Sequence, residues 1–254
     1  MIKAKNKAIT WLLPLLTLLV MVVIWQVLAS VIQLNIILPT PLSALKEFFN
    51  CLLDGAFYIA VGLTLLRTVV CYLICFLLGS ALGYLSFKVN GVNLAISPLI
   101  SLIKSVPTMS VILLILIWVN YEIAPIVIAF IVVFPLSYAS SLSGYKSLDK
   151  SIFDMAKIYK ISDKTLYKNY VLPTLLDNFS ASSVSELLLT FKIVISGEVM
   201  AETARGIGEL IKQSKYALET GKLFAYTIVA VILGVILEYC LKGIVFLLKK
   251  GRKV

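Results

Sequence analysis

Residues 148–173 read LDKSIFDMAKIYKISDKTLYKNYVLP, a lysine-rich stretch that lies between two long apolar runs. Apolar residues at helical spacing in its first half predict a short amphipathic helix, with Ile152, Met155, Ala156 and Tyr159 on one face. A second short helix is expected to open at Ser162, and Pro173 is expected to begin the next long helix. The stretch indicates a water-exposed loop, with helices of its own, between two membrane spans.

Six apolar runs along the chain are each long enough to cross a bilayer. The 254 residues are 60% hydrophobic and 14% charged, with a mean hydropathy of +1.00, a composition far from that of soluble domains. About 20 apolar residues span a bilayer as a helix, whereas isolated strands cannot satisfy their backbone groups in lipid. The sequence therefore predicts an all-α membrane protein with about six transmembrane helices in one domain, residues 1–254. The predicted spans are about 11–32, 59–86, 94–120, 122–143, 174–198 and 223–248.

The distribution of basic residues favours one orientation, because cytoplasmic loops carry an excess of lysine and arginine. With both termini and residues 148–173 in the cytoplasm, fourteen of the 23 basic residues face inward, including Lys3, Lys5 and Lys7. Five face outward: Lys46, Arg205, Lys212, Lys215 and Lys222. The first run is too long for a signal peptide and lacks a small-residue cleavage site. We therefore expect a multi-pass protein of the cell membrane with cytoplasmic termini.

The residue content disfavours several other functions. The net charge of +10 would suit nucleic-acid binding, but the basic residues lie between apolar spans, where they set orientation. Histidine is absent from the sequence and the four cysteines have no CxxC spacing, so no metal site is expected. The sequence has neither a G-x-x-x-x-G-K-[ST] loop nor an H-E-x-x-H motif, so we expect no catalysis. A membrane-embedded enzyme and an ion-coupled secondary transporter remain as alternatives.

The loop resembles the EAA loop of ABC importer permeases, whose pattern is EAA, three residues, Gly, nine residues and then I-x-L-P. Asp154-Met155-Ala156, Lys160 and Tyr170-Val171-Leu172-Pro173 match this spacing at every position. The identities differ: Asp154 stands for Glu, Met155 for the first Ala, Lys160 for Gly and Tyr170 for Ile. A glycine would adopt a positive φ cheaply at the turn between the two short helices, so Lys160 leaves that turn in question.

Further motifs resemble the nitrate/sulfonate/taurine/bicarbonate type of these permeases over about residues 35–248. They are Ile37-Leu38-Pro39-Thr40-Pro41, Thr64-Leu65-Leu66-Arg67, Ile103-Lys104-Ser105-Val106-Pro107, the stretch 191–199, Gly206-Ile207-Gly208 and Leu223-Phe224-Ala225-Tyr226-Thr227. Thr40 and Pro41 also predict the start of a short amphipathic helix outside the membrane.

The resemblance implies a type I ABC importer permease fold. It also implies two permease copies, expected to be identical, two cytoplasmic ATPase subunits that hold ATP and magnesium, and an extracytoplasmic solute-binding protein. No cofactor is expected on this chain. The residues implied to couple it to the ATPase are Ile152, Asp154, Met155, Ala156, Tyr159, Lys160, Leu172 and Pro173. The alternative for the loop helix is a surface helix folded against the membrane.

Four polar or helix-breaking residues within the runs are candidates for a translocation path or gate: Lys104, Pro107, Lys192 and Glu198. A lysine near the middle of a span is costly unless it faces a wet cavity or a partner. For Lys192 an interhelical ion pair and snorkelling remain open, and Glu198, six residues on, does not share its helix face. Pro107 frees a backbone carbonyl, which suits either a gate or a packing kink.

Other residues in the runs are interpreted as structural. Gly79 and Gly83 form a G-x-x-x-G pair, which predicts close helix packing. Arg67 is expected to snorkel outward from its span, and Glu238 with Lys242 forms a favourable i, i+4 pair. Together these features predict a permease that forms the path for a small, anionic or polar organic solute.

Overall fold

The computed structural model describes the backbone of residues 2–250 and the side chains of residues 13, 15–180, 182–247 and 249. Six basic residues used to predict the orientation lie outside the described side chains: Lys3, Lys5, Lys7, Lys250, Arg252 and Lys253.

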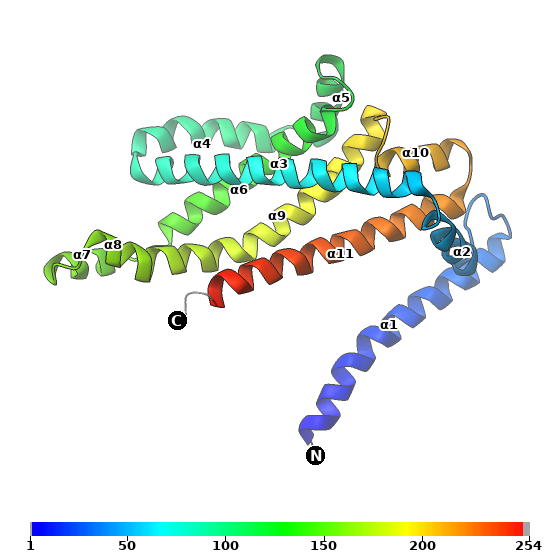
Figure 1. Cartoon of the computed structure of the whole chain (residues 1–254), viewed down its shortest axis with the longest axis horizontal. Coiled ribbons are helices and arrows are strands. Elements are labelled where there is room, and N and C mark those ends of the chain that lie inside the picture. Colours follow the sequence, from blue (N-terminus) through cyan, green and yellow to red (C-terminus); the bar gives the residue numbers. More distant parts are fainter. Residues whose placement is uncertain (1, 251–254) are drawn as a thin grey trace. The chain divides into compact units, whose positions relative to one another are not determined.

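All regular secondary structure in the described residues is helical, so the predicted all-α class is confirmed (Figure 1). The elements are α1 (Ile2–Ile32), α2 (Pro41–Cys51), α3 (Gly55–Lys88), α4 (Asn90–Ser105), α5 (Thr108–Trp118), α6 (Ala124–Lys146), α7 (Lys150–Ile158), α8 (Asp163–Leu166), the π-helical turn η1 (Tyr167–Val171), α9 (Leu172–Ala201), α10 (Ile207–Tyr216) and α11 (Thr220–Lys250).

In the described part of the chain, four helices are long and apolar enough to span a membrane: α1 over Leu15–Ile32, α3, α6, and α11 over Thr220–Leu247. Helices α4 and α5 qualify together as a pair bent by 97°, which gives up to five spans among the described residues. Helix α9, which carries charged and hydroxyl side chains, is not among the candidates found in the described part of the chain. Several of these, such as Glu186 and Thr190, are buried within the protein. The count of six spans stays a prediction.

The chain divides into two compact units, and the expectation of a single domain stays a prediction. The first unit comprises residues up to 59 together with 210–231. There α2 begins as predicted, with the Thr40 hydroxyl accepting the Ser43 N–H at 3.2 Å and Pro41 in the first turn. The Trp25 indole donates to the Pro39 carbonyl at 2.9 Å and stacks on Phe224. These contacts fix the end of α1 to the start of α11.

The second unit comprises residues 60–209 together with 232 onward, and α6 and α9 pack along each other at its centre (Figure 1). Its core joins Cys71 and Cys75 of α3, Ala129 and Val133 of α6, and Val194 of α9. The Ser137 hydroxyl donates to the Glu186 carboxylate at 2.7 Å across the α6–α9 interface. Polar residues of α9 are thus satisfied inside the protein.

Gly79 and Gly83 lie where α3 packs closely against α6. A Cβ added to Gly79 would lie 2.7 Å from Ser137 Cβ, and one added to Gly83 would lie 2.4 Å from Ser141 Oγ and 3.0 Å from the Leu142 nitrogen. Real Cβ atoms do not approach other atoms so closely, so the two backbones meet only because both residues lack a side chain.

We predict that Gly83→Ala destabilises the chain by about 1–3 kcal/mol, because α3 must move away from α6 to admit the methyl group. The thermal unfolding midpoint of the purified chain in detergent measures the effect. Gly91→Ala is the matched control, since an added Cβ there meets nothing within 4 Å. Equal midpoints for the two variants would contradict the proposed close packing.

Candidate functional site

The loop between α6 and α9 forms the predicted pair of short helices. Helix α7 begins at Asp149, whose carboxylate accepts the Ser151 N–H at 2.8 Å. This hydrogen bond holds the pKa of the Asp149 carboxyl below its usual range. Helix α8 begins at Ser162, whose hydroxyl accepts the Thr165 N–H at 3.3 Å. Each helix start is therefore set by a capping side chain in the local sequence.

The same loop is tied to the second unit by a small apolar core. Leu148, Val171 and Leu175 are buried against the aromatic rings of Tyr145, Phe153, Tyr170 and Phe179. The Tyr170 hydroxyl also accepts the Asp149 N–H at 2.7 Å. Leu172 and Pro173 form the first turn of α9, directly after η1. The coupling candidates at the two ends of the loop thus belong to one packed structure.

The predicted apolar face of α7 is divided between the core and solvent. Ala156 is buried and Ile152 is half-buried, while Asp154, Met155 and Tyr159 are exposed. Ile158 and Tyr159 are 76% and 72% exposed. We define the exposed apolar set as Met155, Ile158, Tyr159, Ile161 and Tyr167, which are all exposed. Helical spacing from Met155 could have found Ile158, but Tyr167 lies beyond α7 and has no such signal.

Lys160 occupies the position at which the EAA pattern has glycine, and its φ is 52°. The Ile161 N–H donates to the Ala156 carbonyl at 2.9 Å, and the Lys160 N–H donates to the Lys157 carbonyl at 3.2 Å. These two bonds form a Schellman motif, which ends a helix with a left-handed residue that is usually glycine. The lysine therefore adopts the conformation that the pattern's glycine would adopt, with some backbone strain.

We predict that Lys160→Gly stabilises the α7 turn by roughly 1 kcal/mol, because glycine adopts positive φ without a Cβ clash. Hydrogen exchange of the α7 amides should slow accordingly. Lys157→Gly, one turn earlier inside the helix, should destabilise α7 and speed the exchange of its amides, since glycine in a helix interior costs about 1 kcal/mol. Faster exchange in Lys160→Gly would contradict this assignment of the turn.

Lys104 and Pro107 lie at the sharp bend between α4 and α5. Pro107 immediately precedes α5, and the exposed Lys104 lines a cavity of about 190 Å³ together with Thr108 and Pro135. Neither proline has an N–H, so neither can donate to the carbonyl four residues before it, at Ile103 or Ile131. Ile103 and Ile131 line the same cavity as Lys104, so this cavity lies beside both breaks in the helical hydrogen bonding.

Lys192 is exposed on α9. Among the described side chains no carboxylate pairs with Lys192, so the interhelical ion pair left open by the sequence is not formed within this part of the chain. Its role in a path or gate stays a prediction.

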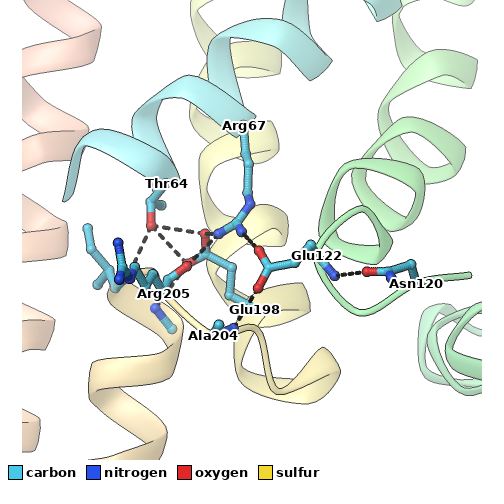
Figure 2. A network of polar contacts seen from close by, with 9 residues as sticks. Thr64, Arg67, Asn120, Glu122, Glu198, Ala204 and Arg205 are labelled. Carbon is cyan, nitrogen blue, oxygen red and sulfur yellow. Dashed lines mark hydrogen bonds and ion pairs between the residues drawn. The ribbon is translucent and has the colours of Figure 1, made fainter. Parts of the chain in front are cut away.

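Glu198 lies at the centre of a buried polar network at the other end of α9 (Figure 2). Its side chain is 0% exposed. It accepts hydrogen bonds from the Arg67 guanidinium at 2.8 Å, the Thr64 hydroxyl at 2.9 and 3.0 Å, and the Gly208 N–H at 3.0 Å. Three structural segments, α3, α9 and the start of α10, therefore meet on one carboxylate.

Arg67 does not snorkel outward, as the sequence had suggested, but is 7% exposed. Besides Glu198 it pairs with Glu122, which precedes α6, and it donates to the Arg205 carbonyl at 2.8 Å (Figure 2). The correction has a simple cause: a buried cation is retained inside a span when carboxylates and carbonyls satisfy it. Sequence reasoning missed Glu122 altogether, because it follows an apolar run without any local pattern.

Comparison with known sequences assigns the chain to a family. The sequence pattern of the family described as binding-protein-dependent transport system inner membrane component matches residues 76–253. The chain belongs to this family. It is an ABC importer permease subunit, a multi-pass component of the inner membrane and the transport subunit of its system, and the resemblance seen in its motifs is confirmed.

Curated relatives are distant but cover most of this permease. It is 23% identical over 91% of its length, and 84% of the relative's, to the putative aliphatic sulfonates transport permease protein SsuC of Bacillus subtilis (strain 168). It is 25% identical to the protein of the same name from Escherichia coli (strain K12), over 88% of this chain and 84% of the relative. A probable ABC transporter permease protein of Haemophilus influenzae is 23% identical, over 89% of this chain and 92% of the relative.

Among solved structures, the MetNI methionine ABC transporter in inward-facing conformations has a similar chain. The TM-score is 0.61 at 16% identity, over 74% of this permease and 94% of the other chain. A second crystal form of the same transporter gives a TM-score of 0.62, over 75% of this permease and 94% of the other chain. The fold is therefore that of a type I ABC importer permease, as predicted.

Proposed function

We propose that the permease forms the path for a small, anionic or polar organic solute in an ATP-driven importer, which receives that solute from an extracytoplasmic binding protein. The observation that carries the proposal is the exposed apolar set on α7 and the segment that follows it, which surrounds residues that match the EAA pattern. Exposed Ile158 and Tyr159 would be a liability in the cytosol unless a partner covers them. A helix seated in a groove is a common way to bury such side chains.

The proposed partner at this loop is an ABC ATPase subunit. Two permease copies and two ATPases would form the complex, with ATP and magnesium held by the ATPases and no cofactor on the permease. Asp154 is exposed on α7 and offers an anion to a basic residue of that partner. ATP binding would draw the two loops together, and the helices that follow them would tilt to open the path outward.

The proposed topology has six spans in one permease domain, with both termini in the cytoplasm. Its support is the excess of basic residues in and around the 148–173 loop. The α4–α5 pair would cross as a bent span, and α9, whose polar side chains are largely buried against protein, would cross beside α6.

The proposed solute is anionic or strongly dipolar. Lys104 lines the cavity at the α4–α5 bend and Lys192 is exposed on α9, so two cations without a described carboxylate partner lie in candidate spans. Two relatives are named for aliphatic sulfonates, which makes a short alkyl sulfonate such as ethanesulfonate the first solute to test.

We predict that Lys192→Met lowers solute uptake at least tenfold, since loss of one favourable charge contact is worth about 1.4 kcal/mol or more. Uptake by proteoliposomes that contain the whole complex measures the effect. Lys242→Met is the matched control, because Lys242 is already paired with Glu238 on α11. Unchanged uptake in Lys192→Met would remove Lys192 from the path.

The proposed function is tested by purifying the tagged permease from its own membranes. An ATPase subunit should copurify, and vanadate should inhibit both ATP hydrolysis and solute uptake after reconstitution. Uptake that follows an imposed proton or sodium gradient without ATP would instead identify an ion-coupled carrier and overturn the proposal.

A further inference from the structure

The bend between α4 and α5 (Figure 1) borders a cavity that is lined by side chains of two kinds. Lys104 and Thr108 are its polar lining residues, and the other lining residues are aliphatic or proline, among them Val111, Ile131 and Val132. Sites for small molecules commonly combine apolar walls with a small number of polar groups. The volume of about 190 Å³ is below the roughly 300–1,000 Å³ of pockets that hold drug-sized ligands. The cavity therefore suits a solute of only a few non-hydrogen atoms.

The two polar side chains of the cavity have no partner among the described side chains. No carboxylate there pairs with the Lys104 ammonium, and neither this group nor the Thr108 hydroxyl takes part in a hydrogen bond within that part of the chain. Lys242, by contrast, is paired with Glu238. A cation at membrane depth is costly unless it is paired or faces water. Lys104 therefore needs an anion or water in this cavity.

The bend is unsuited to facing lipid. Val106 and Pro107 lie between the two helices, and the backbone of Val106 is extended, with a ψ of 131°. Irregular backbone at membrane depth occurs where it is buried in protein or lines a water-filled cavity. Residues 101–110 are all exposed in this chain, so the chain itself does not bury them. Half of them are polar: Ser101, Lys104, Ser105, Thr108 and Ser110. In a permease whose α4–α5 pair crosses the membrane, a surface of this kind lies on the solute path.

The lining fits a molecule that has one charged end and one apolar end. An inorganic anion would pair with Lys104 but leave the aliphatic walls against water, and an uncharged apolar molecule would cover the lysine without a partner. An organic anion with a short aliphatic tail satisfies both parts of the lining. Its oxygen atoms accept hydrogen bonds from the ammonium and the hydroxyl, while its tail removes apolar area from water. A single cation favours a head with a single negative charge.

We propose that this cavity is a solute-binding site of the permease. Lys104 and Thr108 hold the oxyanion of the solute, and Val111, Ile131 and Val132 enclose a tail of a few carbon atoms. The inference rests on the proposed function, and it adds that the permease itself selects the solute by the length of its tail. Alkyl sulfonates and alkyl carboxylates share this chemistry, so the experiment compares the two heads.

The first test labels the cavity of the full-length chain in membrane vesicles. Thr108→Cys is made together with Cys240→Ser, because the other three cysteines are buried. The probes are two thiol reagents, the anionic sulfonatoethyl methanethiosulfonate and the cationic trimethylammonioethyl methanethiosulfonate. Relative to their rates with free cysteine, the anionic reagent should modify Thr108→Cys at least tenfold faster, because Lys104 attracts it. Adding Lys104→Met should reduce that preference at least fivefold. Val235→Cys is the matched control, since Val235 is exposed on α11 and does not line the cavity. Its reagent preference should not respond to Lys104→Met.

Protection from labelling identifies the head and the tail. Ethanesulfonate or propionate should slow the labelling of Thr108→Cys at least threefold at a concentration at which nitrate has no effect, and the stronger of the two identifies the head. Equal protection by nitrate would overturn the proposal, because nitrate has no tail for the aliphatic walls. A Thr108→Cys thiol that neither reagent reaches would also overturn it, as would a reagent preference that Lys104→Met leaves unchanged.

Selection by tail length is tested by uptake into proteoliposomes that contain the whole complex and its binding protein. Val111→Ala enlarges the cavity and should raise the ratio of butanesulfonate uptake to ethanesulfonate uptake at least fivefold, because one or two methylene groups in an apolar pocket commonly change selectivity by this much or more. Val235→Ala removes the same groups from α11 and should leave the ratio unchanged. An unchanged ratio in Val111→Ala, with ATP-dependent uptake intact, would overturn the inference alone. Wild-type uptake that needs no ATP would refute the proposed function instead, and the labelling result depends on neither the ATPase nor the binding protein.

Discussion

Replacing Arg67 with methionine is expected to destabilise the permease by about 3–5 kcal/mol, the usual cost of removing one partner from a buried ion pair. Glu198, at 0% exposed, would keep the Thr64 hydroxyl and the Gly208 N–H but lose its only described cation. For a chain of this size the loss corresponds to a fall of roughly 10 °C in the unfolding midpoint. Thermal unfolding of the purified chain in detergent measures it.

A double-mutant cycle shows whether the cost comes from the unpaired carboxylate. Arg67→Met combined with Glu198→Gln should be more stable than the sum of the single effects predicts, because no buried charge is then left uncompensated. Lys242→Met, which breaks the exposed pair with Glu238, should cost no more than about 1 kcal/mol. An Arg67→Met midpoint equal to that of wild type would show that the network contributes nothing to folding.

Local chemistry was enough to predict several elements. Thr40 and Ser162 cap α2 and α8 as expected, because a capping side chain bonds backbone groups within three residues of itself. The apolar runs likewise predicted the long helices, since about 20 apolar residues have few alternatives in lipid. In each case the information lies within one short segment of the chain.

The Arg67 network was not predictable in this way. Its ion pairs join residues 131 and 55 positions apart, and no periodic pattern connects Thr64 or Arg67 of α3 with their partners. From one helix alone, an arginine near the end of a span suggests snorkelling. Only the packing of α3 against α9 and the segment before α6 decides that it is buried.

The bend near Pro107 and the face of α7 were each predicted in part. A proline inside an apolar run signals a break, but the 97° angle depends on how α5 packs against α6 and α9. On α7, helical spacing identified the apolar residues without showing which are covered. Ala156 is small enough to be buried against the bundle, whereas Ile158 and Tyr159 extend into solvent.

The exposure of Ile158 and Tyr159 predicts a second large effect, on the binding of the ATPase. Ile158→Asp combined with Tyr159→Ala should reduce copurification of the ATPase at least tenfold, because two well-buried anchors at an interface commonly contribute about 2 kcal/mol or more each. The aspartate would also place an unpaired charge in an apolar groove. The molar ratio of ATPase to permease after purification measures the effect, and vanadate-sensitive uptake should fall with it.

The isolated variant chain should meanwhile unfold at the wild-type temperature. Ile158 and Tyr159 are about three-quarters exposed (76% and 72%), so removing them takes little apolar area from the fold itself. Lys164→Ala, on the neighbouring α8, keeps the exposed apolar set and should retain the ATPase. A surface helix folded against the membrane would give a different result, since the double variant would then lose membrane contact but keep its full complement of ATPase. Retained ATPase together with retained uptake would therefore exclude these two residues from coupling, whatever role the rest of the loop has.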